Sequence, residues 1–291
     1  YYDANAAIDV SHELNANLRL EDEFRFDYGY EPDFLNGVAT ALQSGQYRRI
    51  FNRVAAAFSI SPKLSTTISA ALNRIRFNQQ AVARSEDRFS YLLGAMVRYK
   101  LNPKTGVSLT YRHANTRYDS ARSNYESHYV LAGIERDLGD KADLSVGAGV
   151  EFRDSEAANR ARPYVESALN YYFSDATKLQ WASRIGHDDH ELELLGFGTR
   201  FSYRTYLEAS HELTPKLSLG GHAGYQYSRF EDGFASAEMD EEALFAGFQA
   251  EYQLVGNLSV NAGYVFTNYL SDIAERDYER HMFSLGLAGS F

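Results

Sequence analysis

A strict two-residue period runs from Leu217 to Arg229 in the stretch HELTPKLSLGGHAGYQYSRFED. One set of alternate positions holds mainly Leu, Ala and Tyr, and the other holds Ser, Gly, His and Gln. Such a period places successive side chains on opposite faces of a β-strand. The run of 13 residues is longer than the roughly 3–10 residues of most strands in globular proteins. The stretch therefore predicts a long strand with one apolar face and one polar face.

A short turn, LTPKLSL, precedes this strand, and related turns recur along the chain at ISPKLST, LNPKTGVSL, LGDKADLSV, SDATKLQ, LVGNLSV and, more weakly, LNANLRL. Their first apolar residues are 35 to 46 residues apart. Each interval holds two long alternating segments, which is typical of a hairpin, whereas a propeller blade would need four strands. Fifteen strands are predicted, near residues 4–14, 16–28, 46–60, 63–77, 87–101, 105–118, 124–138, 142–153, 162–173, 177–187, 197–213, 216–230, 242–254, 257–270 and 277–291.

Hairpins with short turns on one side and long polar loops on the other are typical of bacterial outer-membrane barrels. A soluble sandwich would show the same alternation, with the apolar face as its core. Tyr and Phe concentrate near strand ends here, and Gly and Ser alternate with charge on the polar face, as expected for aromatic girdles and a wet lumen. The fold class predicted is all-β, a transmembrane antiparallel up-and-down β-barrel that forms one domain over residues 1–291. Its expected location is the outer membrane of a Gram-negative bacterium.

Composition excludes other classes of protein. The chain has no Cys, which rules out disulfides, and its net charge of -10 argues against nucleic acid as a partner. No apolar run is long enough for a transmembrane helix, and the start YYDANAAIDV lacks the pattern of a signal peptide. We therefore interpret the chain as a mature product or a fragment.

The last predicted strand, ERHMFSLGLAGSF, ends in Phe291 with alternate apolar residues before it. It resembles the C-terminal strand of outer-membrane barrels, in which a final Phe is an assembly signal for the barrel assembly machinery. The turn phrases, the phrase YRHANTRYDS and the end AERDYERHMFSLGLAGSF are similar to the beta-barrel porin type 2 family, which is often associated with exopolysaccharide export. This resemblance implies an outer-membrane pore and supplies no catalytic motif.

Members of that family have further strands upstream of a segment like ANAAIDVSHEL. Bacterial single-chain barrels also have even strand numbers, whereas fifteen strands are predicted here. We expect one to three additional N-terminal strands in the complete protein. They would give a barrel of 16 or 18 strands, which is wide enough for an aqueous channel.

The polar face carries charges of both signs, which we expect to line the pore. They either pair across the wall and brace it, or form a charged constriction that selects solutes. Arg49, Arg53, Arg98, Arg200 and Arg204 could also bind an anionic polysaccharide through bidentate contacts. The pore-lining candidates are Arg49, Arg53, Arg88, Arg98, Arg112, Glu151, Arg184, Arg200, Arg204, Glu208, Glu251 and Arg280.

Three polar clusters are weaker candidates for other chemistry. GHDDHE, with His187, Asp188, Asp189, His190 and Glu191, contains metal-ligand types but reads as a polar loop. EMDEE lacks the ligand spacing of a calcium loop, so a solvated acidic loop is favoured for Glu238, Asp240, Glu241 and Glu242. His222 with Ser218 and Ser228 could suggest a hydrolase, but a lumenal histidine is favoured because no acidic partner or oxyanion feature is evident. No metal, cofactor or catalytic site is assigned.

The predicted function is a non-enzymatic outer-membrane channel for polar solutes or for exopolysaccharide export. A structural or adhesive barrel that acts through its surface loops is the alternative, and an outer-membrane hydrolase is the third. The expected partners are outer-membrane lipid, the barrel assembly machinery and an anionic polysaccharide. Alternation predicts that Val97, Val146, Ala148 and Phe248 face lipid. Ala148→Arg should therefore impair assembly, whereas Gly149→Arg should be tolerated or narrow the pore.

Overall fold

The computed structural model describes residues 4–29, 46–80, 83, 87–119, 124–155, 159–188, 199–231, 239–256, 258–272 and 277–289. These residues form fifteen strands, as predicted, within a few residues of the expected bounds. The strands are β1 (Ala4–Asn15), β2 (Leu18–Gly29), β3 (Tyr47–Ser59), β4 (Leu64–Phe77), β5 (Arg88–Asn102), β6 (Thr105–Tyr118), β7 (Tyr125–Asp137), β8 (Ala142–Ser155), β9 (Asn159–Ser174), β10 (Thr177–Asp188), β11 (Thr199–Thr214), β12 (Leu217–Glu231), β13 (Met239–Val255), β14 (Leu258–Ser271) and β15 (Tyr278–Gly289).

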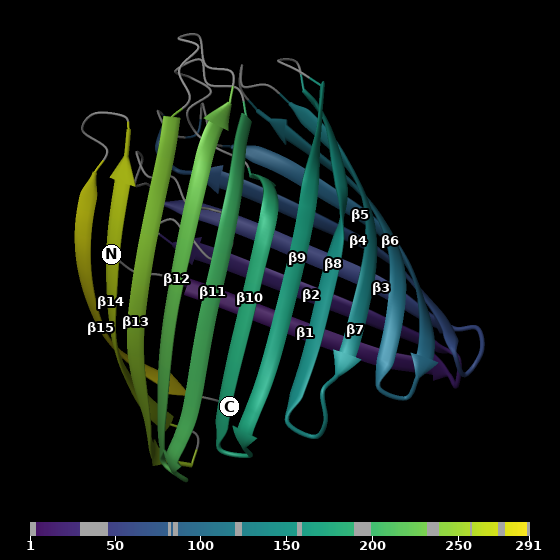
Figure 1. The fold of residues 1–291 in the computed structure, drawn as a ribbon. Helices are drawn as coiled ribbons and strands as arrows, with labels where there is room; N and C mark the ends of the chain where they lie inside the picture. Colours follow the sequence, from purple (N-terminus) through teal and green to yellow (C-terminus); the bar gives the residue numbers. More distant parts are fainter. Residues whose placement is uncertain are drawn as a thin grey trace.

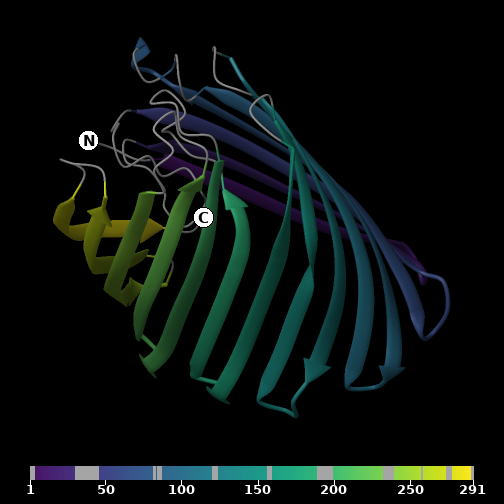
Figure 2. The same cartoon turned by 45° about the horizontal axis from the view of Figure 1, so that its top comes forward.

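Each strand pairs antiparallel with its neighbours in sequence, which gives one sheet in the order β1 to β15. The sheet curls around a central space (Figures 1 and 2), and β1 and β15 are its two edge strands in the described part of the chain. No helix among the described residues is long and apolar enough to cross a membrane. The architecture is therefore the predicted up-and-down barrel wall.

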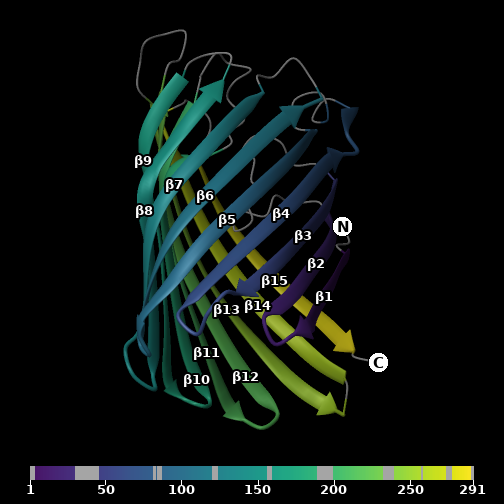
Figure 3. The ribbon, with the colours of Figure 1, turned by 90° about the vertical axis from the view of Figure 1, so that its right-hand side faces the viewer.

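Seven short turns join the strands at one end of the sheet, the lower end in Figure 3. In five of them a side-chain oxygen accepts a hydrogen bond from the backbone N–H two residues later. The distances are 2.9 Å from Asn15 Oδ1 to Asn17 N, 3.3 Å from Ser61 Oγ to Lys63 N, 2.9 Å from Asn102 Oδ1 to Lys104 N, 2.9 Å from Asp137 Oδ1 to Gly139 N and 3.2 Å from Thr214 Oγ1 to Lys216 N. Asn, Asp and Thr stabilise tight turns in this way, which explains why related phrases recur along the sequence.

The apolar face of the sheet is its outer face, and no second layer of described residues covers it. Leu109, Phe248 and Leu285 are 61%, 50% and 80% exposed. Fully buried positions are instead often polar, such as Ser127, Glu151 and Ser228. A soluble sandwich would show the reverse, because its apolar face would be its core. The outer face is therefore suited to lipid.

Aromatic residues on the outer face cluster toward both ends of the strands. Near the short turns lie Phe58, Tyr99, Phe173 and Tyr252, and near the opposite ends lie Phe24, Phe26, Phe89, Tyr91, Phe152 and Tyr203. The band between them is mainly aliphatic and also contains Tyr111, Phe248 and Phe266. This is the arrangement of the two aromatic girdles of an outer-membrane barrel.

The four residues predicted to face lipid do share the outer face, and Val97 is 48% exposed. The prediction for Gly149 was wrong, because a Cβ there would lie 1.9 Å from the backbone oxygen of Val130. Any side chain at this inward position would displace the neighbouring strand. Ser145 is the better inward control, because it already carries a Cβ and is exposed on the inner face opposite Glu135.

We expect Ala148→Arg to impair assembly, since arginine on the lipid face at mid-height costs roughly 2–4 kcal/mol. Ser145→Arg should assemble as the unaltered protein does, because its new charge would lie in the lumen beside Glu135. Heat-modifiable migration on gels after folding into lipid vesicles measures the folded fraction of each variant. Equal folding of the two variants would contradict the assignment of the faces.

Candidate functional site

The inner face of β2 to β9 carries ion pairs that join strands along the wall. Arg49 Nη1 lies 3.6 Å from Asp27 Oδ2, and its Nε donates to Asn73 Oδ1 at 3.1 Å. Arg53 Nη1 lies 3.9 Å from Glu23 Oε2. Both arginines were predicted to line the pore, and in the structure each has an acidic neighbour on β2.

Arg98 on β5 reaches over β6 to Glu135 on β7, with Nη2 to Oε2 at 2.5 Å. Gly106 lies beneath this contact, and a Cβ there would approach Arg98 Nε to 3.0 Å. A glycine at this place lets the guanidinium lie flat against the wall. The side chains of Arg98 and Glu135 remain 35% and 37% exposed, so the pair contributes only about 0–1 kcal/mol to stability.

Arg112 on β6 and Glu166 on β9 form a two-pronged ion pair across β7 and β8. Arg112 Nη1 donates to Oε2 at 2.7 Å and Nη2 donates to Oε1 at 2.6 Å. Tyr164 Oη also donates to Oε2 at 3.0 Å. Gly147 on the intervening β8 leaves room, since a Cβ there would lie 3.3 Å from Glu166 Cγ. This parallel geometry is the strongest form of an arginine–carboxylate contact.

Glu151 is fully buried on the inner face and is the centre of a hydrogen-bond network. Its Oε1 accepts from Ser127 Oγ at 2.9 Å and from Tyr129 Oη at 3.0 Å. Its Oε2 accepts from both the backbone N and Nδ1 of His187 at 3.1 Å. Four donors thus balance the loss of solvation of one buried carboxylate. The network fixes the end of β10 against β7 and β8.

The remaining pore-lining candidates have other positions. Arg88 is buried, Glu208 accepts from Tyr206 Oη at 3.3 Å, and Glu251 is exposed. Arg184 Nη2 lies 3.4 Å from the backbone oxygen of His187. Arg204 lies opposite Arg184 and Gln226, and Arg280 lies opposite Thr267. The side chain of Arg200, and Phe291 as a whole, lie outside the described residues.

The weaker candidates do not assemble into a site in the described part of the chain. His187 belongs to the Glu151 network, whereas the side chain of Asp188 and Asp189, His190, Glu191 and Glu238 lie outside the described residues. Asp240 pairs with Arg229 at 3.0 Å, Ser271 Oγ donates to Glu241 Oε1 at 3.2 Å, and Glu242 lies opposite Tyr227.

The proposed hydrolase residues are separated by the strand that carries them. His222 lies opposite Glu208 and Gly247, whereas Ser218 and Ser228 are four and six positions away on the same face of β12. At about 3.3 Å per residue, these serines are roughly 13 and 20 Å from His222 along the strand. Ser228 Oγ instead accepts a hydrogen bond from Gln226 Nε2 at 3.0 Å.

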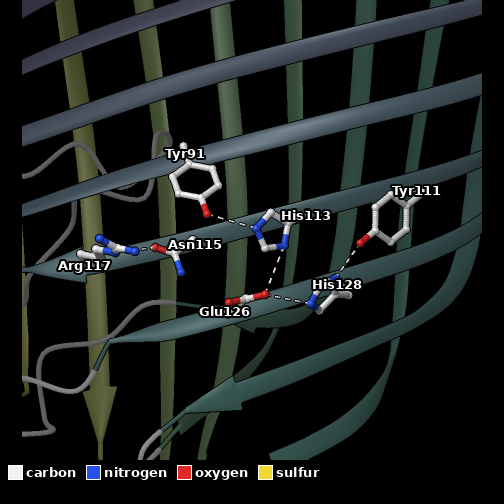
Figure 4. A network of polar contacts seen from close by, with 7 residues as sticks. All are labelled: Tyr91, Tyr111, His113, Asn115, Arg117, Glu126 and His128. Carbon is white, nitrogen blue, oxygen red and sulfur yellow. Dashed lines mark hydrogen bonds and ion pairs between the residues drawn. The ribbon is translucent and has the colours of Figure 1, made fainter.

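The sequence analysis missed a polar cluster on the outer face of β6 and β7, formed by His113, Glu126 and His128 (Figure 4). His113 belongs to the phrase YRHANTRYDS, whose alternation places it on the opposite face from Arg112. The sequence did contain a signal for this cluster, because polar residues occupy outward positions on two consecutive strands. Their register could not be obtained from the sequence.

We expect Glu151→Ala to lower the free energy of unfolding by about 3–5 kcal/mol, because the buried donors of Ser127 and His187 and the half-buried Tyr129 hydroxyl lose their acceptor. Glu251→Ala, which removes an exposed carboxylate from the same face, should change it by about 0.5 kcal/mol or less. Urea unfolding from lipid vesicles, followed by the fluorescence of the single Trp181, measures both. Similar values for the two variants would show that the network does not stabilise the wall.

Comparison with known proteins identifies the family. Residues 139–291, slightly more than half of the chain, match the family model described as Putative beta-barrel porin 2. No curated protein sequence matches the chain.

Several solved structures share the fold at low sequence identity. The FrpB iron transporter from Neisseria meningitidis (F3-3 variant) is 9% identical with a TM-score of 0.54, over 99% of this chain and 57% of that chain. The ferric citrate transporter FecA is 13% identical with a TM-score of 0.51, over 98% and 55%. The ferric yersiniabactin uptake receptor FyuA from Yersinia pestis is 9% identical with a TM-score of 0.53, over 99% and 56%.

The chain spans slightly more than half the length of these structures, and at this identity they establish the fold alone. The outer-membrane barrel architecture and the family match agree with each other and with the lipid-compatible outer face. The protein therefore resides in the outer membrane of a Gram-negative bacterium and belongs to the Putative beta-barrel porin 2 family.

Proposed function

We propose that the protein is a non-enzymatic channel that lets polar solutes cross the outer membrane through its lumen. One observation carries this proposal: charged groups of both signs lie on the inner face and remain partly exposed, whereas the outer face is apolar. Arg53 is 45% exposed and Glu135 is 37% exposed on that face. Such groups need water, so a hydrated lumen follows from their solvation.

The pairing of arginines with carboxylates bears on selectivity. Arg49, Arg53, Arg98 and Arg112 each lie beside an acidic residue, so their positive charge is largely balanced close to the wall. We infer a channel with weak charge preference that admits neutral and modestly charged solutes. The same residues would therefore both stabilise the wall and give the lumen a polar lining with little net charge.

Export of an anionic polysaccharide is a narrower form of this function. Its support is the association of the family with exopolysaccharide export that the sequence resemblance implies, together with the arginines of the inner face. An anionic oligosaccharide would have to displace Glu23 or Glu135 from Arg53 or Arg98 to gain two-pronged contacts. Block of conductance by such an oligosaccharide, and weaker block of the Arg98→Ala variant, would support this form over general solute passage.

We expect two matched variants to shift ion preference in opposite directions in planar bilayers. Arg98→Ala leaves Glu135 unbalanced and should move the reversal potential in a salt gradient toward cation preference. Glu135→Gln leaves Arg98 unbalanced and should move it toward anion preference by a similar amount. The effect acts within a Debye length, about 8 Å at physiological salt.

Conductance with the same reversal potential in both variants would mean that this pair lies outside the conducting path. Absence of conductance in the unaltered protein would overturn the channel and favour a structural or adhesive barrel. Turnover of phospholipid or lipid A by the purified protein would favour the hydrolase instead.

A further inference from the structure

Polar side chains replace apolar ones on the outer face of β6 and β7 toward the ends away from the short turns. On β6 the outward residues change from Leu109 and Tyr111 to His113, and on β7 they change from Val130 to His128. The two histidines are directly opposite each other in the strand register. The cluster therefore lies where the lipid-facing band ends, beside the aromatic Tyr91 and Tyr111 (Figure 4).

Three potential ligand atoms converge in this cluster. Glu126 Oε1 is 3.5 Å from His113 Nδ1 and 3.0 Å from His128 Nε2. The three atoms all lie within 4.8 Å of one another, and the imidazole centroids are 4.9 Å apart. The cluster differs from an acidic patch, because it combines two imidazoles with one carboxylate.

A tyrosine hydroxyl contacts each imidazole at the ring nitrogen that does not face Glu126. Tyr91 Oη lies 3.2 Å from His113 Nε2, and Tyr111 Oη lies 2.7 Å from His128 Nδ1. A tyrosine hydroxyl can accept a hydrogen bond from these nitrogens, which leaves a lone pair on the nitrogen that faces Glu126. His113 Nδ1 is buried and makes no hydrogen bond to any residue that the structure describes. Orientation of this kind by a second group is usual for metal-binding histidines.

We propose that His113, Glu126 and His128 bind a divalent transition cation of the zinc class, with one coordination position left open. Imidazole and carboxylate ligands at about 2.0–2.1 Å from zinc would be about 3.3 Å apart in a tetrahedral site. The two measured separations of 3.5 and 3.0 Å are already close to this value. The separation between His113 Nδ1 and His128 Nε2 is within 4.8 Å, and metal binding would bring these two atoms closer together.

The bound cation would join β6 to β7 on the outer face, outside the lumen that the proposed channel uses. Imidazole ligands favour Zn²⁺, Cu²⁺ and Ni²⁺ over Mg²⁺ and Ca²⁺, which prefer oxygen ligands. Selectivity for zinc over magnesium therefore distinguishes this site from general binding of cations by an acidic protein. A cluster without metal would instead hold Glu126 by hydrogen bonds from the imidazoles alone.

A similar group of residues on β14 and β15 provides a matched control for the proposed metal site. Tyr264 Oη lies 2.8 Å from His281 Nδ1, and His281 Nε2 lies 3.0 Å from Glu279 Oε1. This repeats the Tyr111–His128–Glu126 arrangement with nearly equal distances but without the second imidazole. Within the described residues, only the cluster on β6 and β7 brings three such ligands together.

The experiment titrates the folded, detergent-solubilised protein with Zn²⁺ in calorimetry and measures bound zinc after dialysis. We expect one Zn²⁺ per chain, not displaced by excess Mg²⁺. His113→Ala, His128→Ala and Glu126→Gln should each weaken binding at least tenfold, and Tyr111→Phe should weaken it about tenfold. His281→Ala should bind as the unaltered protein does.

Folding of each variant is checked by heat-modifiable migration on gels, and Glu126→Gln keeps the shape of the side chain if the alanine variants fail to fold. Co²⁺ provides a second measurement, because a tetrahedral site gives strong visible absorption that His113→Ala should abolish. Absence of stoichiometric Zn²⁺ binding would overturn the proposal. Equal loss of binding in His281→Ala, or unchanged binding in the folded cluster variants, would do so as well.

Discussion

In lipid, each strand must satisfy its backbone N–H and C=O groups by pairing with its neighbours, since no water is available to replace them. The ladder from β1 to β15 meets this requirement for every internal strand. Once the backbone is paired in this way, strict alternation follows, because the two faces of one sheet meet different surroundings. The outer face is apolar and the inner face carries charge, and neither face needs a second layer of protein.

The inner face stabilises the wall through contacts that cross intervening strands. Arg98 and Arg112 reach their carboxylates over β6, or over β7 and β8, and Gly106 and Gly147 make room for these paths. The Arg98–Glu135 pair is partly exposed and contributes little free energy, so its main effect is to balance charge along the lumen. The two-pronged Arg112–Glu166 pair is stronger and also joins β6 to β9. Glu151 is different, because it is fully buried and accepts four hydrogen bonds. The lumen thus combines one rigid buried centre with a polar lining that water can reach.

Histidine has two roles in this wall. At the end of β10, His187 donates to the inward-facing Glu151 through Nδ1 and its backbone N–H, and it completes a network that joins three strands. On the outer face, His113 and His128 point toward one carboxylate oxygen, with a tyrosine behind each ring. The two places differ in their surroundings. His187 contacts one buried carboxylate that also accepts from Ser127 and Tyr129, whereas the strand register places His113 and His128 opposite each other on β6 and β7.

The sequence alone predicted the fifteen strands, the seven short turns and the side of the sheet on which Arg98, Arg112 and Glu151 lie, because a period of two and recurrent turn residues are local properties. The sequence left a soluble β-sandwich as an alternative fold. Only the structure excluded that fold, because the outer face of the single sheet is not covered by a second layer. Partners such as Glu135 for Arg98 and Glu166 for Arg112, the clash at Gly149 and the cluster of His113 with His128 were decided by the tertiary structure. These contacts depend on strand register and on side chains that cross neighbouring strands, and a linear pattern contains neither.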